Sequence, residues 1–118
     1  MVTIELFRNE ENTVHFAVGT TIFSAGDSGG TMYVVVDGEV ELLVNDKIVE
    51  KLGPGGVLGE MSLIDSVPRS ATAIAKTDCR LVPIDEKRFK FLVQQTPNFA
   101  LQIMRVIADR LRRMDSRL

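Results

Sequence analysis

The chain has 118 residues, a net charge of −2 and one cysteine, and these numbers exclude several classes of protein. With 14 basic and 16 acidic residues there is no excess of positive charge for binding nucleic-acid phosphates, so we expect no nucleic-acid partner. Cys79 alone forms no internal disulfide, and neither a signal peptide nor an apolar run of about 18 to 20 residues is present. We therefore expect a cytoplasmic protein without a membrane partner.

Residues 14–84 alternate short apolar runs with turn residues. Runs occur at residues 14–18, 21–24, 31–36, 39–44, 47–52, 71–75 and 79–84. Short strands at about ten-residue spacing, separated by Gly, Asp, Asn or Pro, are typical of an antiparallel sandwich or barrel. The Asp37-Gly38 pair lies between two such runs, and we expect it to form a type I′ hairpin turn.

A short helix is predicted after the strands. Asp85 is suited to cap a helix over residues 86–95, because its side chain can accept a hydrogen bond from the first turn. Phe89, Leu92 and Val93 fall on one face of that helix. Thr96-Pro97 ends it, and proline is tolerated in the first turn of a following helix.

The last predicted helix, over residues 97–117, carries a heptad pattern. Its apolar residues step by 3, 4, 3 and 4 positions and are Met104, Ile107, Leu111, Met114 and Leu118. Such a pattern favours a parallel homodimer through this helix. Packing of the same face on the strands alone is the alternative. Leu101, Ile103 and Val106 widen the apolar stripe, so one helix has room for both contacts.

Residues 53–73, GPGGVLGEMSLIDSVPRSATA, carry the most distinctive chemistry. We expect a short helical turn over residues 60–64, anchored to the core by Leu63 and Ile64. Arg69 follows closely enough to loop back over this turn, and its guanidinium matches two phosphate oxygens. Glu60 repels a phosphate but suits ribose hydroxyls. Phosphate plus ribose indicates a nucleotide, while a Glu60–Arg69 salt bridge that only braces the loop is the alternative.

These motifs resemble the cyclic nucleotide-binding domain family. The stretch GEMSLIDSVPRSAT, residues 59–72, is similar to the family's phosphate-binding cassette, and AGDSGGTMYVVVDGEV, residues 25–40, to its hairpin signature. The resemblance covers the chain from about residue 7 onwards. It implies a mainly β fold: an antiparallel jelly-roll β-barrel over about residues 13–84, then a short hinge helix and a long C-terminal helix over about residues 85–118. Together they would form a single domain of residues 1–118.

The resemblance also implies roles for individual residues. Glu60 would accept a hydrogen bond from the ribose 2′-hydroxyl, and Arg69 would hold the cyclic phosphate. Further ligand contacts are implied at Gly59, Met61, Ser62, Ser70 and Ala71. From the last helix, Arg110, Met114 and Asp115 would close over the base, although bacterial activators carry threonine and serine where this chain has Met114 and Asp115. Ser62 is also suited to cap the short helical turn, and we expect Tyr33 and Leu58 to be core residues.

The function predicted from these residues is cyclic nucleotide binding by a regulatory sensor module that uses no cofactor and catalyses no reaction. Ser70 resembles the serine of bacterial cAMP regulators, so cAMP is expected ahead of cGMP, and the downstream protein partner is not identified. One alternative is a dimerisation or interaction module that binds no cyclic nucleotide. Another is a metal-dependent enzyme on the same barrel shape, for which His15 and Cys79 provide too few ligands.

Overall fold

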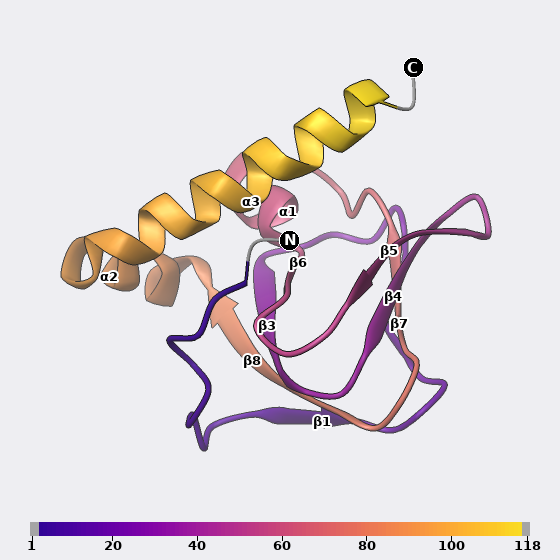
Figure 1. Ribbon diagram of the computed structural model, residues 1–118, viewed down its shortest axis with the longest axis horizontal. Coiled ribbons are helices and arrows are strands. Elements are labelled where there is room, and N and C mark those ends of the chain that lie inside the picture. The colour runs from indigo at the N-terminus through magenta and orange to yellow at the C-terminus, as the bar shows by residue number, and fades with distance from the viewer. Residues whose placement is uncertain (1–2, 117–118) are drawn as a thin grey trace.

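The computed structural model describes the backbone of residues 3–116 and the side chains of residues 3–113. Strands β1 to β6 come first, helix α1 separates them from β7 and β8, and helices α2 and α3 end the chain (Figure 1). The strands are β1 (Val14–Phe16), β2 (Thr21–Phe23), β3 (Thr31–Asp37), β4 (Val40–Val44), β5 (Lys47–Leu52), β6 (Val57–Leu58), β7 (Thr72–Ala75) and β8 (Cys79–Asp85). The helices are α1 (Glu60–Asp65), α2 (Glu86–Gln95) and α3 (Pro97–Ser116).

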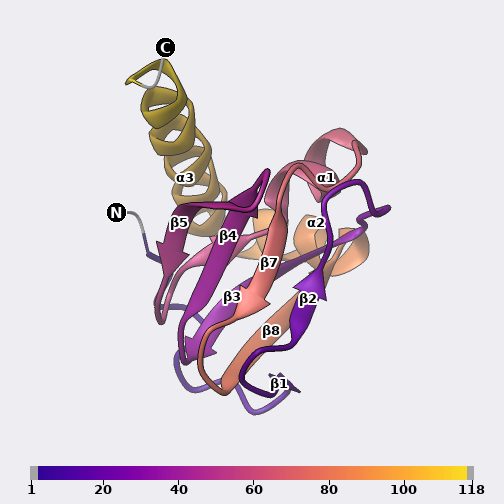
Figure 2. The same ribbon diagram turned by 90° about the vertical axis from the view of Figure 1, so that its right-hand side faces the viewer.

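The strands form two four-stranded antiparallel sheets that lie face to face (Figure 2). One sheet has the order β1-β8-β3-β6 and the other the order β2-β7-β4-β5, so the chain passes back and forth between them as a jelly roll does. No strand pairing joins the two sheets within residues 3–116, so the barrel is not closed. The predicted fold class, antiparallel jelly-roll β structure followed by helices, is confirmed.

Strand β3 is buried on both faces, which explains its unbroken apolar run. Its alternate residues Met32 and Val34 join a core cluster on the helix side of the sheet, together with Val82 and Phe99. Val35 points the other way, into a second cluster between the two sheets. A strand covered on both faces reads as a continuous hydrophobic run rather than an alternating one.

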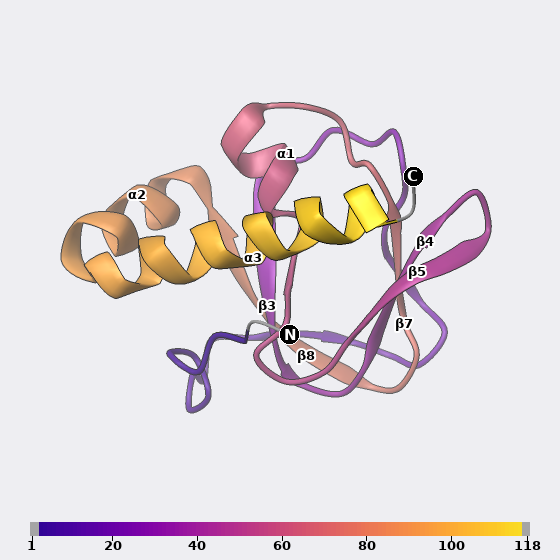
Figure 3. The ribbon, with the colours of Figure 1, turned by 45° about the horizontal axis from the view of Figure 1, so that its top comes forward.

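The two C-terminal helices close the helix side of this core. Asp85 caps α2 as predicted, because its Oδ1 accepts a hydrogen bond of 2.8 Å from the backbone N–H of Arg88. Phe99, Ile103 and Val106 bury one face of α3. Beyond this contact α3 continues across the end of the two sheets, where Figure 3 shows it passing beside α1. This path brings its second half to the cassette.

The predicted heptad stripe on α3 is divided between two faces. The heptad prediction assigned Ile107 to the dimer contact, but this residue is partly buried and packs against the helix-side core. Leu101, Met104 and Leu111 are exposed, and the Met104 side chain is 63% exposed. The side chains of Met114 and Leu118 lie outside the described residues. An apolar stripe without a partner in the described part of the chain therefore runs along the outer face of α3.

The predicted hairpin at Asp37-Gly38 is wrong. Strands β3 and β4, which flank it, belong to different sheets, so the turn is a corner between sheets. Only Gly38 has a positive φ there, at 94°, whereas a type I′ turn requires two such residues. That geometry occurs instead at Asn45 and Asp46, with φ of 51° and 64°, in the true hairpin between β4 and β5.

The cassette helix α1 matches its predicted position, but only one of its two predicted anchors is buried. Leu63 packs into the helix-side core, whereas Ile64 is exposed. Ahead of the helix, the short strand β6 was not predicted; it pairs with β3 through Val57↔Val34 and Leu58↔Tyr33. Leu58 is fully buried, and Tyr33 packs against the inter-sheet cluster, as expected of core residues.

Candidate functional site

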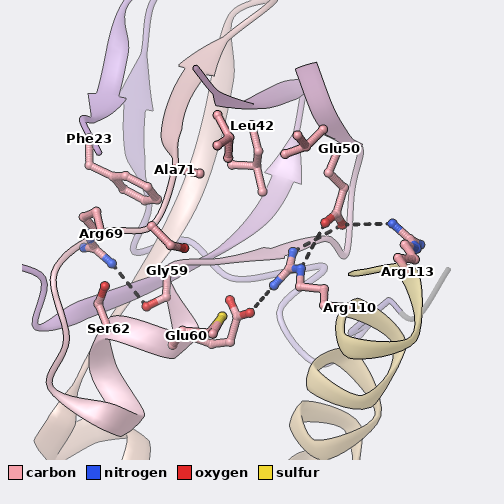
Figure 4. Close-up of a pocket in the computed structure, with 14 residues that line it drawn as sticks. Phe23, Leu42, Glu50, Gly59, Glu60, Ser62, Arg69, Ala71, Arg110 and Arg113 are labelled. Carbon is pink, nitrogen blue, oxygen red and sulfur yellow. Dashed lines mark hydrogen bonds and ion pairs between the residues drawn. The ribbon is translucent and has the colours of Figure 1, made fainter. Parts of the chain in front are cut away.

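A pocket of about 380 Å³ lies between the cassette, the β4–β5 hairpin and α3. Figure 4 shows residues from these elements pointing toward the same space. It is lined by Phe23, Leu42, Val44, Val49, Glu50, Gly59, Glu60, Met61, Ser62, Arg69, Ser70, Ala71, Arg110 and Arg113. Its volume is within the range of small-molecule sites, about 300 to 1,000 Å³, and its apolar walls carry a few charged groups.

Arg69 forms one end of the pocket as a buried cation with no carboxylate partner among the described residues. Its side chain donates to backbone there: Nη1 to the Gly59 carbonyl oxygen at 3.1 Å and Nη2 to that of Thr31 at 2.7 Å. Cζ lies 4.1 Å from the centre of the Phe23 ring. The Nε atom is buried with no hydrogen-bond partner in the described structure. Arg69 is 7% exposed, so its charge has been largely removed from water.

Burial dominates the electrostatics of Arg69. Desolvation lowers the pKa of the guanidinium, and Tyr33, Asp27 and Glu60 offset only part of that effect. Arginine nonetheless remains protonated at neutral pH. A buried charge that lacks a counter-ion is costly, so this end of the pocket would be stabilised by an anion.

Two glycines allow the backbone to approach the Arg69 side chain. Gly59 precedes α1 with a φ of 80°, and a Cβ atom there would lie 2.5 Å from Arg69 Nη1. A Cβ atom on Gly29 would lie 2.6 Å from Arg69 Nε. Both distances are too short for a Cβ atom, so a residue other than glycine at either position would displace the guanidinium or the backbone. The two glycines therefore leave the space that the guanidinium occupies.

Glu60 begins α1 on the pocket floor and is 2% exposed. Its carboxylate forms an ion pair with Arg110 Nη1 from α3. The alternative prediction, a Glu60–Arg69 salt bridge that braces the loop, is wrong: among the residues described, the ion-pair partner of Glu60 is Arg110, which lies 50 positions further along the chain. The carboxylate and the Arg69 guanidinium therefore occupy separate parts of the pocket.

Arg110 connects α3 with the cassette and the hairpin. Its Nε donates to Glu50 Oε1 at 3.0 Å and its Nη2 to Glu50 Oε2 at 3.3 Å. Nη2 also donates to the carbonyl oxygen of Val57. Burial lowers the pKa of Arg110, but the attraction of Glu60 and Glu50 outweighs it, so the pKa is raised. Arg113, one turn further on, pairs with Asp109 at 2.8 Å and with Glu50 at 3.6 Å.

The structure brings together almost all the residues predicted for the site. Those that line the pocket are Gly59, Glu60, Met61, Ser62, Arg69, Ser70, Ala71 and Arg110. The side chains of Met114 and Asp115 lie outside the described residues. Ser62 does not cap α1, because the N-cap position is Gly59 and no side chain donates or accepts there. Ser62 instead lies buried beside the pocket.

Sequence reasoning missed Glu50 and Arg113 among the charged groups. Glu50 interrupts the apolar run of β5, and its side chain is only 11% exposed. A carboxylate directly after the apolar pair Ile48-Val49 of a predicted strand was a signal for a buried partner. Arg113 gave no such signal, because it is one of several arginines near the C-terminus of a helix, where the helix dipole already favours an exposed cation.

Among the described residues, no helix is long and apolar enough to cross a membrane. No group of three or more His, Cys, Asp and Glu side chains in the described part is placed to hold a metal ion.

Comparison with known proteins places this site in a family. The family model for the cyclic nucleotide-binding domain matches residues 13–96. A relative from Mycobacterium tuberculosis, a CRP-like cAMP-activated global transcriptional regulator, is 30% identical over 110 residues, which cover 89% of this chain and 49% of that protein. The chain thus spans about half the length of the curated relatives it matches.

Solved structures agree with this match. The crystal structure of Thermus thermophilus catabolite activator protein has a TM-score of 0.82 and 32% identity, over 90% of this chain and 52% of that one. A structure from a cyclic-GMP-dependent signalling pathway that regulates bacterial phytopathogenesis has a TM-score of 0.80 and 31% identity, over 92% of both chains. From the family match over most of its length, the chain belongs to the cyclic nucleotide-binding domain family.

Proposed function

We propose that this pocket binds cAMP and that the chain is a regulatory sensor module without catalytic activity or a cofactor. The observation that carries the proposal is the state of Arg69: a cation in the pocket wall, 7% exposed, that lacks any carboxylate partner in the described structure. A structural arginine in such a place would be expected to have a counter-ion. One that lacks it is suited to receive a charged ligand.

The cyclic phosphate would bind at this end of the pocket. Its single negative charge matches one guanidinium, and the unpartnered Nε of Arg69 is a donor ready for a phosphate oxygen. Ser70 and Ala71 line the same wall, and their backbone amides would add donors. The approach is open because Gly59 and the small side chains of these two residues leave room for the ligand.

The ribose would lie over Glu60. Its carboxylate already accepts from Arg110, but two carboxylate oxygens offer about four acceptor positions, so a 2′-hydroxyl can bind as well. Arg110 would then contact the same carboxylate as the sugar. The ligand and α3 would thus be connected through one group, which makes the position of α3 sensitive to occupancy.

The base preference is supported by Ser70 and by the relatives. Ser70 resembles the serine of bacterial cAMP regulators, and the Mycobacterium tuberculosis relative is described as cAMP-activated. The structural neighbour from a cyclic-GMP-dependent pathway makes cGMP the alternative ligand.

Occupancy would reach the helices through the core. Leu63 of α1 packs in the same cluster as Phe89 and Leu92 of α2, so an inward movement of the cassette would displace the hinge helix. The ligand can shift such an equilibrium only by its difference in affinity for the two states. The downstream protein partner would read the position of α3.

Isothermal calorimetry of nucleotide-stripped protein tests the proposal. We expect micromolar or tighter binding of cAMP, and a loss of at least about 100-fold in Arg69→Ala, because two charge-assisted hydrogen bonds disappear. Arg80→Ala is the matched control, since Arg80 pairs with Asp37 outside the pocket. Circular dichroism checks that both variants fold. Wild-type affinity in Arg69→Ala, or no binding of any cyclic nucleotide to the unaltered chain, would overturn the proposal.

We also propose a homodimer through the outer face of α3. Met104 and Leu111 of the predicted heptad face are exposed, and Leu101, one of the residues that widen the apolar stripe, is exposed as well. Sedimentation equilibrium should give a dimer for the wild type and a monomer for Met104→Glu. Phe91→Glu is the control, because Phe91 on α2 is 60% exposed and lies outside the stripe. A monomeric wild type contradicts this proposal and leaves the nucleotide site unaffected.

A further inference from the structure

A buried cluster of charges lies at the end of the pocket opposite Arg69. Figure 4 shows Glu50 of β5 facing Arg110 and Arg113 of α3, across the pocket from the Arg69 guanidinium. The Glu50 side chain is 11% exposed. A largely buried carboxylate is costly unless its hydrogen-bonding positions are used, by the protein itself or by a ligand.

Arg110 uses only part of the capacity of Glu50. It donates once to each carboxylate oxygen, at 3.0 Å to Oε1 and 3.3 Å to Oε2. Arg113 Nη1 lies 3.6 Å from Oε2, which is an ion pair beyond hydrogen-bond distance. Since a carboxylate has about four acceptor positions, those not facing Arg110 remain for another donor. Glu50 lines the pocket, so a ligand can supply that donor.

We propose that Glu50 selects the base of the nucleotide by accepting a hydrogen bond from the amino group of adenine. This inference rests on the proposed function: with the phosphate at Arg69 and the ribose at Glu60, the base extends toward the hairpin and lies near Leu42 and Glu50. Adenine carries its amino group at C6, at the far side of the base from the sugar. A carboxylate, which only accepts, is complementary to that group.

Guanine has the opposite chemistry at the same place. Its O6 is an acceptor where adenine has the N6 donor, so it would face the Glu50 carboxylate with two acceptors opposed. Guanine can donate to a carboxylate with two parallel N–H groups, at N1 and at the N2 amino group. Arg110 already donates in this way, with one hydrogen bond to each oxygen of Glu50. Glu50 therefore disfavours guanine as well as favouring adenine, which is how binding sites achieve specificity.

The test is a series of ligands that differ at one group. The probes are cAMP, cGMP and the 3′,5′-cyclic monophosphate of purine riboside, which has the shape of cAMP without its amino group. We expect the wild type to bind cAMP at least about tenfold more tightly than the purine riboside analogue, because a hydrogen bond to a charged acceptor is lost. This comparison uses the unaltered protein, so it does not depend on a variant that folds.

Glu50→Gln then tests the residue itself. Arg110 would hold the amide oxygen of the glutamine, leaving its NH₂ group toward the base, where it opposes adenine and suits guanine O6. We expect the ratio between cAMP and the purine riboside analogue to fall to about one, and cGMP binding to improve. Glu41→Gln is the control: Glu41 is on neighbouring β4, pairs with Lys76 and does not line the pocket, and its side chain is 18% exposed.

The ratio separates this role from a structural one. If Glu50 only supports Arg110, its loss weakens every ligand equally and the ratio stays as in the wild type, which overturns the inference. A wild type that binds cAMP and the purine riboside analogue equally, or prefers cGMP, also overturns it while leaving the proposed function intact. If the wild type binds none of the three, both proposals fail.

Discussion

The two buried arginines of the pocket have opposite surroundings. Arg69 is bonded to two backbone carbonyl oxygens and stacks on Phe23, with no carboxylate at ion-pair distance in the described structure. Arg110 pairs with Glu60 and Glu50 and also donates to the Val57 carbonyl oxygen. Both residues line the same cavity, so they differ in whether the fold itself places a carboxylate beside the guanidinium.

The pKa directions of the two groups express this difference. Burial lowers the pKa of Arg69, because nothing nearby compensates its desolvation fully. For Arg110 burial acts in the same direction, yet the two carboxylates outweigh it and raise the pKa. A paired buried charge is costly to break, whereas an unpaired one can be compensated by a charged ligand. The pocket thus has an arginine paired by the fold at one end and, at the other, the arginine that we propose binds the ligand.

The ion pairs of Arg110 also determine how α3 is held. One side chain from α3 contacts the start of α1 through Glu60 and the β5 strand through Glu50. A ligand hydroxyl at Glu60 would change the charge distribution that Arg110 experiences. If a ligand binds as proposed, Arg110 would therefore link the site directly to the helix that carries the exposed stripe.

The largest expected effect comes from removing this link. Arg110→Gln should lower the free energy of unfolding of the nucleotide-free chain by about 3 kcal/mol, because it leaves the buried Glu60 carboxylate without its ion-pair partner and Glu50 with only Arg113 at 3.6 Å. Arg69→Gln should cost less than about 1.5 kcal/mol, because it removes hydrogen bonds but also a costly buried charge. Urea unfolding of both variants measures the difference. Equal losses of stability in the two variants would show that Arg110 is no more important to the fold than Arg69.

Local signals in the sequence were sufficient for the helices and for every strand except the two-residue β6. The apolar runs predicted seven of the strands, and Asp85 marked the start of α2 through a contact only three residues away. The Asp37-Gly38 prediction failed because a turn pair specifies a hairpin only if its flanking strands pair with each other. Here β3 pairs with β8, more than 40 residues later, and no local pattern contains that information.

For the site as well, local motifs were predictable and long-range partners were not. Glu60 and Arg69 belong to one short motif, so their presence in the pocket was predictable. Their actual partners were not: Glu60 pairs with Arg110, 50 positions away, and Arg69 donates to Thr31, 38 positions away. Glu50 reaches the pocket only because β5 and α3 meet there. The specificity proposed for it thus depends on long-range packing.

The smallest expected effect comes from a change at Gly29, the residue that packs behind the Arg69 side chain. A Cβ atom on Gly29 would lie 2.6 Å from both Arg69 Nε and Ser62 Cβ, so Gly29→Ala must displace the backbone at Gly29 or both of these groups. Ser62 is held within α1, so we expect the Gly29 backbone and the Arg69 side chain to shift together. We expect cAMP affinity to fall about tenfold, less than in Arg69→Ala, because the charge remains but its donors are misaligned.

Gly30→Ala provides the control for this effect. It makes the same change one residue along, where a Cβ atom would meet nothing within 4 Å. Calorimetry with cAMP should therefore give wild-type affinity for Gly30→Ala and reduced affinity for Gly29→Ala, while the Arg110 ion pairs stay as they are. If Gly29→Ala and Gly30→Ala bind cAMP equally well, the affinity does not depend on the exact position of the Arg69 guanidinium. The two arginines would then differ only in how their charges are compensated.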